Sequence, residues 1–184
     1  MPAVNSNASP TTIPPHISRY LLGPIDEDRQ FDFLIGDWDV QATKFGPDGA
    51  TLARYQATWC AKYLNDGRML MDNFQALAPD GRPISSFVTL RTYSTESRRW
   101  EMAGLGAMQT AAAVEWYGTW TDGEMHVIAS GEDPAGRLVQ TRIRFSDITP
   151  EHFLWTSECS VDGGTSWART AALVANRAVG ESSQ

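Results

Sequence analysis

Turn signals recur along this chain at a nearly constant interval, and that interval limits the fold more than any other feature. Glycine-containing turn clusters occur at residues 46–49, 65–67, 79–81, 121–123, 133–136 and 162–164. Five of these six clusters contain an Asp-Gly pair, which supplies the positive φ angles that tight hairpin loops require. From Gly67 onward the turn glycines are separated by multiples of 13 or 14 residues. The missing turns fall at 94–97, 108–111 and 149–151, of which 108–111 has the weakest turn sequence.

These nine turns predict ten segments, which alternate in the two-residue period of half-buried strands. Residues 38–42 and 153–159 show the alternation, and so do residues 54–63, whose apolar face comprises Tyr55, Ala57, Trp59, Ala61 and Tyr63. Helical periodicity is confined to residues 26–35, where one apolar stripe comprises Phe31, Leu34 and Ile35.

Short connections predict that consecutive strands pair antiparallel as a meander. An open sheet of ten strands would expose two unpaired edges, and closure into a barrel removes both. We therefore predict an all-β fold, a closed antiparallel up-and-down barrel of about ten strands, with a short N-terminal helix plugging one end. The barrel domain is expected at residues 26–177, with flexible tails at 1–25 and 178–184.

Composition narrows the possible partners and location. The 184 residues include 15 basic and 22 acidic side chains, so the formal net charge is −7, which disfavours nucleic acid as a partner. No apolar run approaches the ~20 residues of a membrane helix, and the N-terminal segment lacks the pattern of a secretory signal, so a cytoplasmic location is expected. Cys60 and Cys159 are expected to be buried free thiols.

Motifs at both ends of the predicted barrel carry a family resemblance. Phe33-Leu34-Ile35-Gly36-Asp37-Trp38 places a Gly-x-Trp at the start of the first strand, which resembles the lipocalin and calycin signature. Near the C-terminus, Phe153-Leu154-Trp155 followed by Ser160-Val161-Asp162-Gly163-Gly164 and Trp167 is similar to a family of small bacterial lipocalin-like barrels. These are grouped with heme-binding-like and nitrobindin-like barrels, and the resemblance covers residues 27–177.

The resemblance implies that a basic residue of the last strand, Arg169 or Arg177, packs over the Trp38 indole. In nitrobindin-type barrels it also implies a heme held by a histidine near the chain end. Residues 165–177 contain no histidine, so heme is disfavoured and no cofactor is expected.

Three residues are candidates for acid–base catalysis. His126 lies in the middle of a predicted strand, and if it faces inward it is the best single candidate for a general base or an axial ligand. Glu115 and Tyr117 share one strand face, but the alternative places Trp116 and Trp120 inward and turns these two toward water. The three histidines are too dispersed for a zinc site, so no metal is expected.

Ligand-binding candidates come from the residues assigned or allowed an inward orientation. Tyr55, Trp59 and Tyr63 favour a flat apolar or aromatic ligand, although they can equally be filling of the barrel. Arg91 is either an interior anchor for an anion or a surface cation, and Asn73 is equally open. The full set of candidates is Tyr55, Trp59, Tyr63, Asn73, Phe87, Arg91 and Trp116.

Three functional hypotheses follow. The first is a barrel that binds a small hydrophobic or aromatic molecule. The second is a cofactor-independent lyase, isomerase or cyclase that acts by acid–base catalysis in the same cavity, and the third is a heme-binding barrel with His126 as ligand. A homodimer through the strand that carries Arg142 and Arg144 is an additional possibility.

Overall fold

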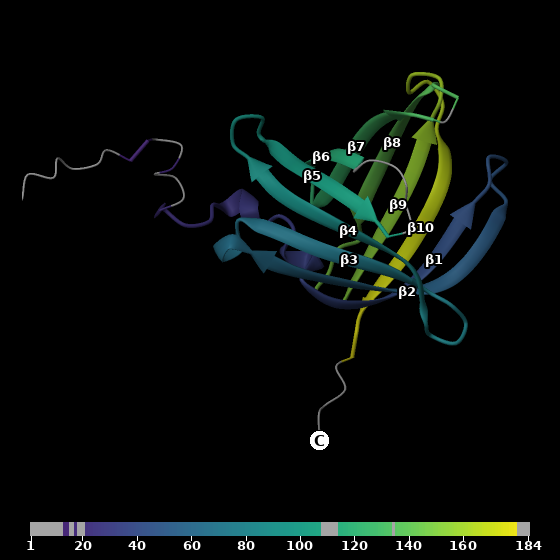
Figure 1. Ribbon diagram of the computed structural model, residues 1–184, viewed down its shortest axis with the longest axis horizontal. Helices are drawn as coiled ribbons and strands as arrows, with labels where there is room; N and C mark the ends of the chain where they lie inside the picture. The colour runs from purple at the N-terminus through teal and green to yellow at the C-terminus, as the bar shows by residue number, and fades with distance from the viewer. Residues whose placement is uncertain (1–12, 15–16, 18–20, 108–113, 134, 180–184) are drawn as a thin grey trace, which may run out of the picture.

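A computed structural model describes residues 13–14, 17, 21–107, 114–133 and 135–179 (Figure 1). Its strands are β1 (Gly36–Phe45), β2 (Thr51–Leu64), β3 (Met69–Leu77), β4 (Pro83–Ser94), β5 (Arg99–Gly106), β6 (Val114–Thr121), β7 (Glu124–Glu132), β8 (Leu138–Ser146), β9 (His152–Ser160) and β10 (Ala168–Arg177). The described residues also form the 3₁₀ helices η1 (Asp26–Arg29), η2 (Asp32–Leu34) and η3 (Asn65–Gly67).

The strands form one closed antiparallel barrel in which each strand pairs with its neighbours in sequence and β10 returns to β1. The closing ladder runs from Trp38 opposite Arg177 to Lys44 opposite Ala171. This confirms the predicted up-and-down barrel of ten strands. The predicted turn at 108–111 lies outside the described residues.

Alternation along the strands sorts the side chains as predicted. Trp38, Val40 and Ala42 of β1 are buried, and so are Ala57, Trp59 and Ala61 of β2. Cys60 belongs to the opposite face of β2 and is exposed, so the prediction of a buried thiol there was wrong. In the alternation of β2, Cys60 falls on the same face as Gln56, Thr58 and Lys62, which is the outer face. The general tendency of cysteine to be buried does not change the face on which it lies.

The predicted N-terminal helix forms as two separate 3₁₀ turns, η1 and η2. They lie beside the η3 end of the barrel (Figure 1), where the Asp28 carbonyl accepts a hydrogen bond from the Tyr63 hydroxyl at 3.2 Å. Phe31 and Leu34 are fully buried and join the aromatic core that fills this end. The Phe31 ring meets Trp100 edge-on at 4.8 Å between centroids and Phe145 at 5.8 Å. These turns therefore close the barrel at the end where β1 begins.

Arg177 fastens the closing ladder to the closed end. Its guanidinium lies 3.9 Å from the centre of the Trp38 ring and donates hydrogen bonds to the carbonyls of Ile35 and Pro150. Arg177 therefore takes the position that the resemblance implied for Arg169 or Arg177. Arg169 instead lies 6.0 Å from the Phe45 ring, near the other end of β1.

The described part of the chain contains no helix that is long and apolar enough to cross a membrane.

Arg177→Ala is expected to lower the free energy of unfolding by about 1–3 kcal/mol, because a cation–π contact and several hydrogen bonds to carbonyls are lost together. Urea unfolding followed by tryptophan fluorescence measures the change. Arg169→Ala is the matched control and should change stability by less than about 0.5 kcal/mol. Equal losses in the two variants would contradict a fastening role for Arg177.

Candidate functional site

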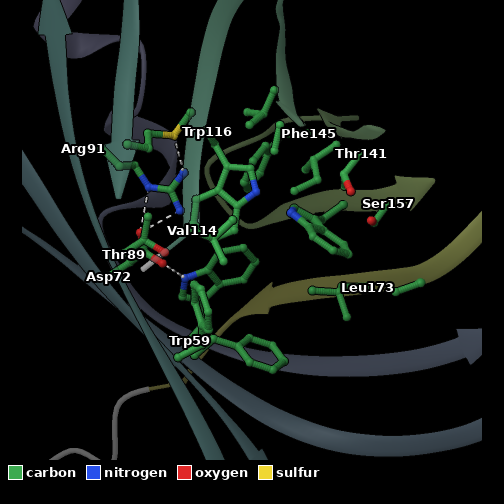
Figure 2. A pocket seen from close by; sticks show the side chains of 18 of the residues that line it. Trp59, Asp72, Thr89, Arg91, Val114, Trp116, Thr141, Phe145, Ser157 and Leu173 are labelled. Carbon is green, nitrogen blue, oxygen red and sulfur yellow. Dashed lines mark hydrogen bonds and ion pairs between the residues drawn. The ribbon is translucent and has the colours of Figure 1, made fainter. Parts of the chain in front are cut away.

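The barrel encloses a cavity of about 840 Å³ that reaches from the aromatic core to the end where β1 finishes. Its floor includes Trp59, Asp72 and Arg91, and its rim includes Lys44 and Glu132. Cavities of roughly 300–1,000 Å³ hold drug-sized molecules. This cavity is the candidate site, and Figure 2 shows it from close by.

A buried ion pair forms one side of the floor. Asp72 on β3 and Arg91 on β4 are almost completely inaccessible, with exposed fractions of 1% and 5%. Both Nε and Nη2 of Arg91 lie 2.7 Å from Asp72 Oδ2, while Trp59 Nε1 donates to Asp72 Oδ1 at 2.8 Å. Nη1 of Arg91 lies 3.1 Å from the Met102 sulfur. Dashed lines mark this network in Figure 2.

The network satisfies both buried charges within the protein. A buried ion pair is tolerated when its geometry is good and additional hydrogen bonds occupy the remaining donors and lone pairs. Here the indole of Trp59 supplies one such bond, and the Arg91 guanidinium lies 4.8 Å from the centre of the Phe31 ring. The floor therefore presents a balanced pair to the cavity, with no net charge.

Aromatic rings line much of the wall above this floor. Phe87 and Trp116 contact each other edge to face at 5.4 Å, and Trp59 and Phe74 do so at 5.6 Å. Gly104 of β5 makes the first contact possible, because a Cβ atom there would lie 2.3 Å from Trp116 and 2.4 Å from Phe87. Glycine is therefore required at position 104, inside a strand, because the two rings occupy the space that a side chain would fill.

Hydroxyl groups and small side chains complete the wall. Thr89 of β4 lies beside the ion pair, while Thr141 of β8 and Ser157 of β9 face it from the other side of the cavity (Figure 2). The Ser157 Oγ accepts a hydrogen bond from Thr170 Oγ1 at 3.0 Å. The cavity is therefore mainly apolar with a few polar groups, as small-molecule pockets generally are.

Partial desolvation shifts the pKa values of two titratable groups that line the cavity. Burial lowers the pKa of the Lys44 ammonium and raises the pKa of the Tyr55 phenol. Both shifts favour the neutral form, which is the direction that desolvation always takes.

Five of the ligand-binding candidates line the cavity. They are Tyr55, Trp59, Phe87, Arg91 and Trp116. Arg91 faces inward but is neutralised by Asp72, so its charge is not free to hold an anionic ligand. Contact of these five residues with a ligand stays a prediction.

Tyr63 and Asn73 lie away from the cavity. The Tyr63 hydroxyl donates to Asp32 and Asp28 at the closed end, so this ring supports η1 and η2. Asn73 is paired with Cys60 and Val88 in the sheet and shares their outer face.

The three catalytic candidates also lie on the outer surface of the barrel. Glu115 is exposed and accepts a long hydrogen bond of 3.4 Å from the Tyr117 hydroxyl, while Trp116 points inward. His126 is exposed beside Glu124, with 3.4 Å between Nε2 and Oε2. The arrangement with Trp116 and Trp120 inward is thus the one that the structure adopts. An inward-facing general base at these positions has no geometric support.

Sequence reasoning missed Asp72 and Lys44 as cavity residues. The signal for Asp72 was its parity with Leu70 and Phe74, and the signal for Lys44 was its parity with Val40 and Ala42. Both are charged, and a charged residue in an alternating strand is ordinarily assigned to water.

The residues that the structure describes contain no cluster of three or more potential metal ligands. A heme held by a histidine also fits poorly, because His126 and His152 both lie outside the cavity. His16 lies outside the described residues.

No protein-family model and no curated protein matches this chain. Among solved structures, it is similar to Rv2717c from M. tuberculosis, with a TM-score of 0.57 and 15% identity over 85% of this chain and 100% of the other. It is also similar to the S-type phycobiliprotein lyase CPES from Guillardia theta, with a TM-score of 0.58 and 12% identity over 88% and 97%. The likeness establishes a lipocalin-like barrel fold, and the implied kinship with nitrobindin-like barrels stays a prediction.

Asp72→Asn is expected to lower the free energy of unfolding by about 3–5 kcal/mol, because the Arg91 guanidinium is left buried without a counter-charge. Guanidinium chloride unfolding measures the loss. The double variant Asp72→Asn/Arg91→Met carries no charge at the floor and retains an acceptor for Trp59. It should recover at least half of that loss, and additive losses would show that the two charges do not depend on each other.

Tyr63 is expected to titrate far later than an ordinary phenol. Desolvation, followed by its hydrogen bond to Asp32, raises the pKa of Tyr63 to about 12. Because the folded-state pKa exceeds the unfolded value near 10, the stabilisation is complete below pH 10 and is lost as the pH rises through 12. Ultraviolet titration should show one phenol ionising near pH 12 that disappears in Tyr63→Phe. An unchanged titration curve in that variant would contradict the assignment.

Proposed function

We propose that this protein binds a small hydrophobic or aromatic molecule inside the barrel. The observation that carries the proposal is the cavity of about 840 Å³ inside the barrel, whose floor charges cancel and whose walls are mainly apolar with several aromatic rings. A closed barrel has no need of such a space for its own stability, because unfilled volume removes packing contacts.

The character of the wall supports a flat, largely apolar ligand. The rings of Phe74, Phe87 and Trp116 offer faces and edges for stacking on an aromatic molecule. Thr89, Thr141 and Ser157 place polar groups around the lower cavity, where they can meet a ligand hydroxyl or carbonyl. These groups give orientation, whereas the burial of apolar area gives most of the affinity.

No specific observation at the site supports either enzymatic chemistry or heme binding. The phycobiliprotein lyase CPES is only 12% identical to this chain, so the similarity concerns the fold alone. His126, the histidine considered for both roles, is exposed on the outer surface. Simple binding therefore explains the cavity best.

Thr141→Trp is expected to abolish binding of small aromatic ligands, because the indole would occupy the space between β8 and the ion pair. Ligands are found by thermal shift against a panel of neutral aromatic and aliphatic compounds, and affinities follow from isothermal titration calorimetry. A ligand present at 100 times its Kd stabilises the folded state by about 2.7 kcal/mol, which is easily detected.

Thr119→Trp is the matched control, since Thr119 is exposed on the outer face of β6. It should retain the wild-type affinity, while Thr141→Trp loses at least tenfold. A panel that leaves the melting temperature unchanged, or equal loss in both variants, would count against binding in the cavity.

A further inference from the structure

The sequence contains two lysines, Lys44 and Lys62, and the barrel turns them in opposite directions. Lys44 is exposed at the rim of the cavity, which it lines, and it follows Val40 and Ala42 in the inward parity of β1. Lys62 belongs to the outward parity of β2 and is exposed. The pair thus provides one cation at the cavity and one equivalent cation outside it.

Lys44 has room around it. In the barrel it lies between Ala53 of β2 and Ala171 of β10, two of the smallest side chains. Within the described part of the chain, no hydrogen bond or ion pair engages its ammonium group. This combination leaves the ammonium accessible to a molecule that enters the cavity.

The charge balance of the cavity also depends on Lys44. The charged lining residues are Lys44, Asp72, Arg91 and Glu132. Asp72 and Arg91 cancel each other at the floor. Glu132 is exposed at the end of β7, in the parity opposite to the inward Val127 and Ala129, so the inward-facing charge that remains is that of Lys44.

We propose that the ligand is an amphipathic organic anion whose apolar or aromatic body fills the barrel and whose carboxylate or sulfonate pairs with Lys44. This inference rests on the proposed function and specifies its class of ligand. The partly desolvated ammonium gains a counter-charge when the anion arrives, so the pairing replaces hydration that the cavity has already reduced. A ligand with its acidic group at the floor would instead meet the Asp72–Arg91 pair, whose charges already cancel and leave no counter-charge for it.

Two fluorescent probes that differ in one group test this inference. Anilinonaphthalene sulfonate carries the anion, and N-phenylnaphthylamine has the same ring skeleton without it. Both are titrated into the wild type, Lys44→Met and Lys62→Met, and the dissociation constant is read from probe fluorescence. Circular dichroism confirms that each variant is folded, so that neither probe reports exposed core.

Lys44→Met should weaken the sulfonate probe by roughly three- to tenfold and change the neutral probe by less than about twofold. Lys62→Met should leave both affinities unchanged. Added salt should weaken the sulfonate probe on the wild type and have little effect on Lys44→Met.

The remaining outcomes separate the two proposals. If both probes bind the wild type and lose affinity in Thr141→Trp, but Lys44→Met does not discriminate between them, the Lys44 pairing is wrong and cavity binding stands. If Lys62→Met weakens the sulfonate probe as much as Lys44→Met does, the effect is one of net charge and the inference is again overturned. If neither probe binds, both proposals fail for this class of molecule.

Discussion

The ladder between β1 and β10 is the constraint on which the rest of the structure depends. It joins the two ends of the barrel domain, and without it β1 and β10 would be open edges with unpaired backbone groups. Arg177 ties this ladder to Trp38 and to the carbonyl of Ile35, so the last residue of the last strand holds the first residues of the barrel. Closure of the barrel therefore creates the interior and determines which side chains face it.

Within that interior, charge is arranged by depth. The deepest charged groups, Asp72 and Arg91, are matched to each other and to the Trp59 indole, which leaves the lower cavity electrically balanced. Lys44 and Glu132 stand at the rim, where water still reaches them and a full internal network is not required. Charged groups at the rim are thus followed by aromatic surface deeper in the barrel, an order that matches the amphipathic ligand proposed above.

The sequence was sufficient for the fold and for part of the site. Periodic glycine-containing turns, most of them with Asp-Gly, together with two-residue alternation determine a meander, and the pattern of β2 assigned Trp59 to the interior correctly. The same alternation could not show which face of β6 points inward, because Trp116 and Tyr117 are both aromatic and lie on opposite faces. Register with β5, where Gly104 opens space for Trp116, decides the orientation. Asp72 and Arg91 escaped notice as a pair because their partnership depends on packing across a hairpin.

Gly104 has a broader consequence for how this cavity can change. Its missing side chain is the space in which Phe87 and Trp116 meet, so the shape of that wall is set by backbone rather than by a replaceable group. In a closed sheet the strand has no free edge toward which it can shift to admit a methyl group. Any side chain at 104 must displace one of the two rings, and a ring displaced inward takes volume from the cavity. The capacity of the barrel is therefore controlled from a position that no ligand would touch.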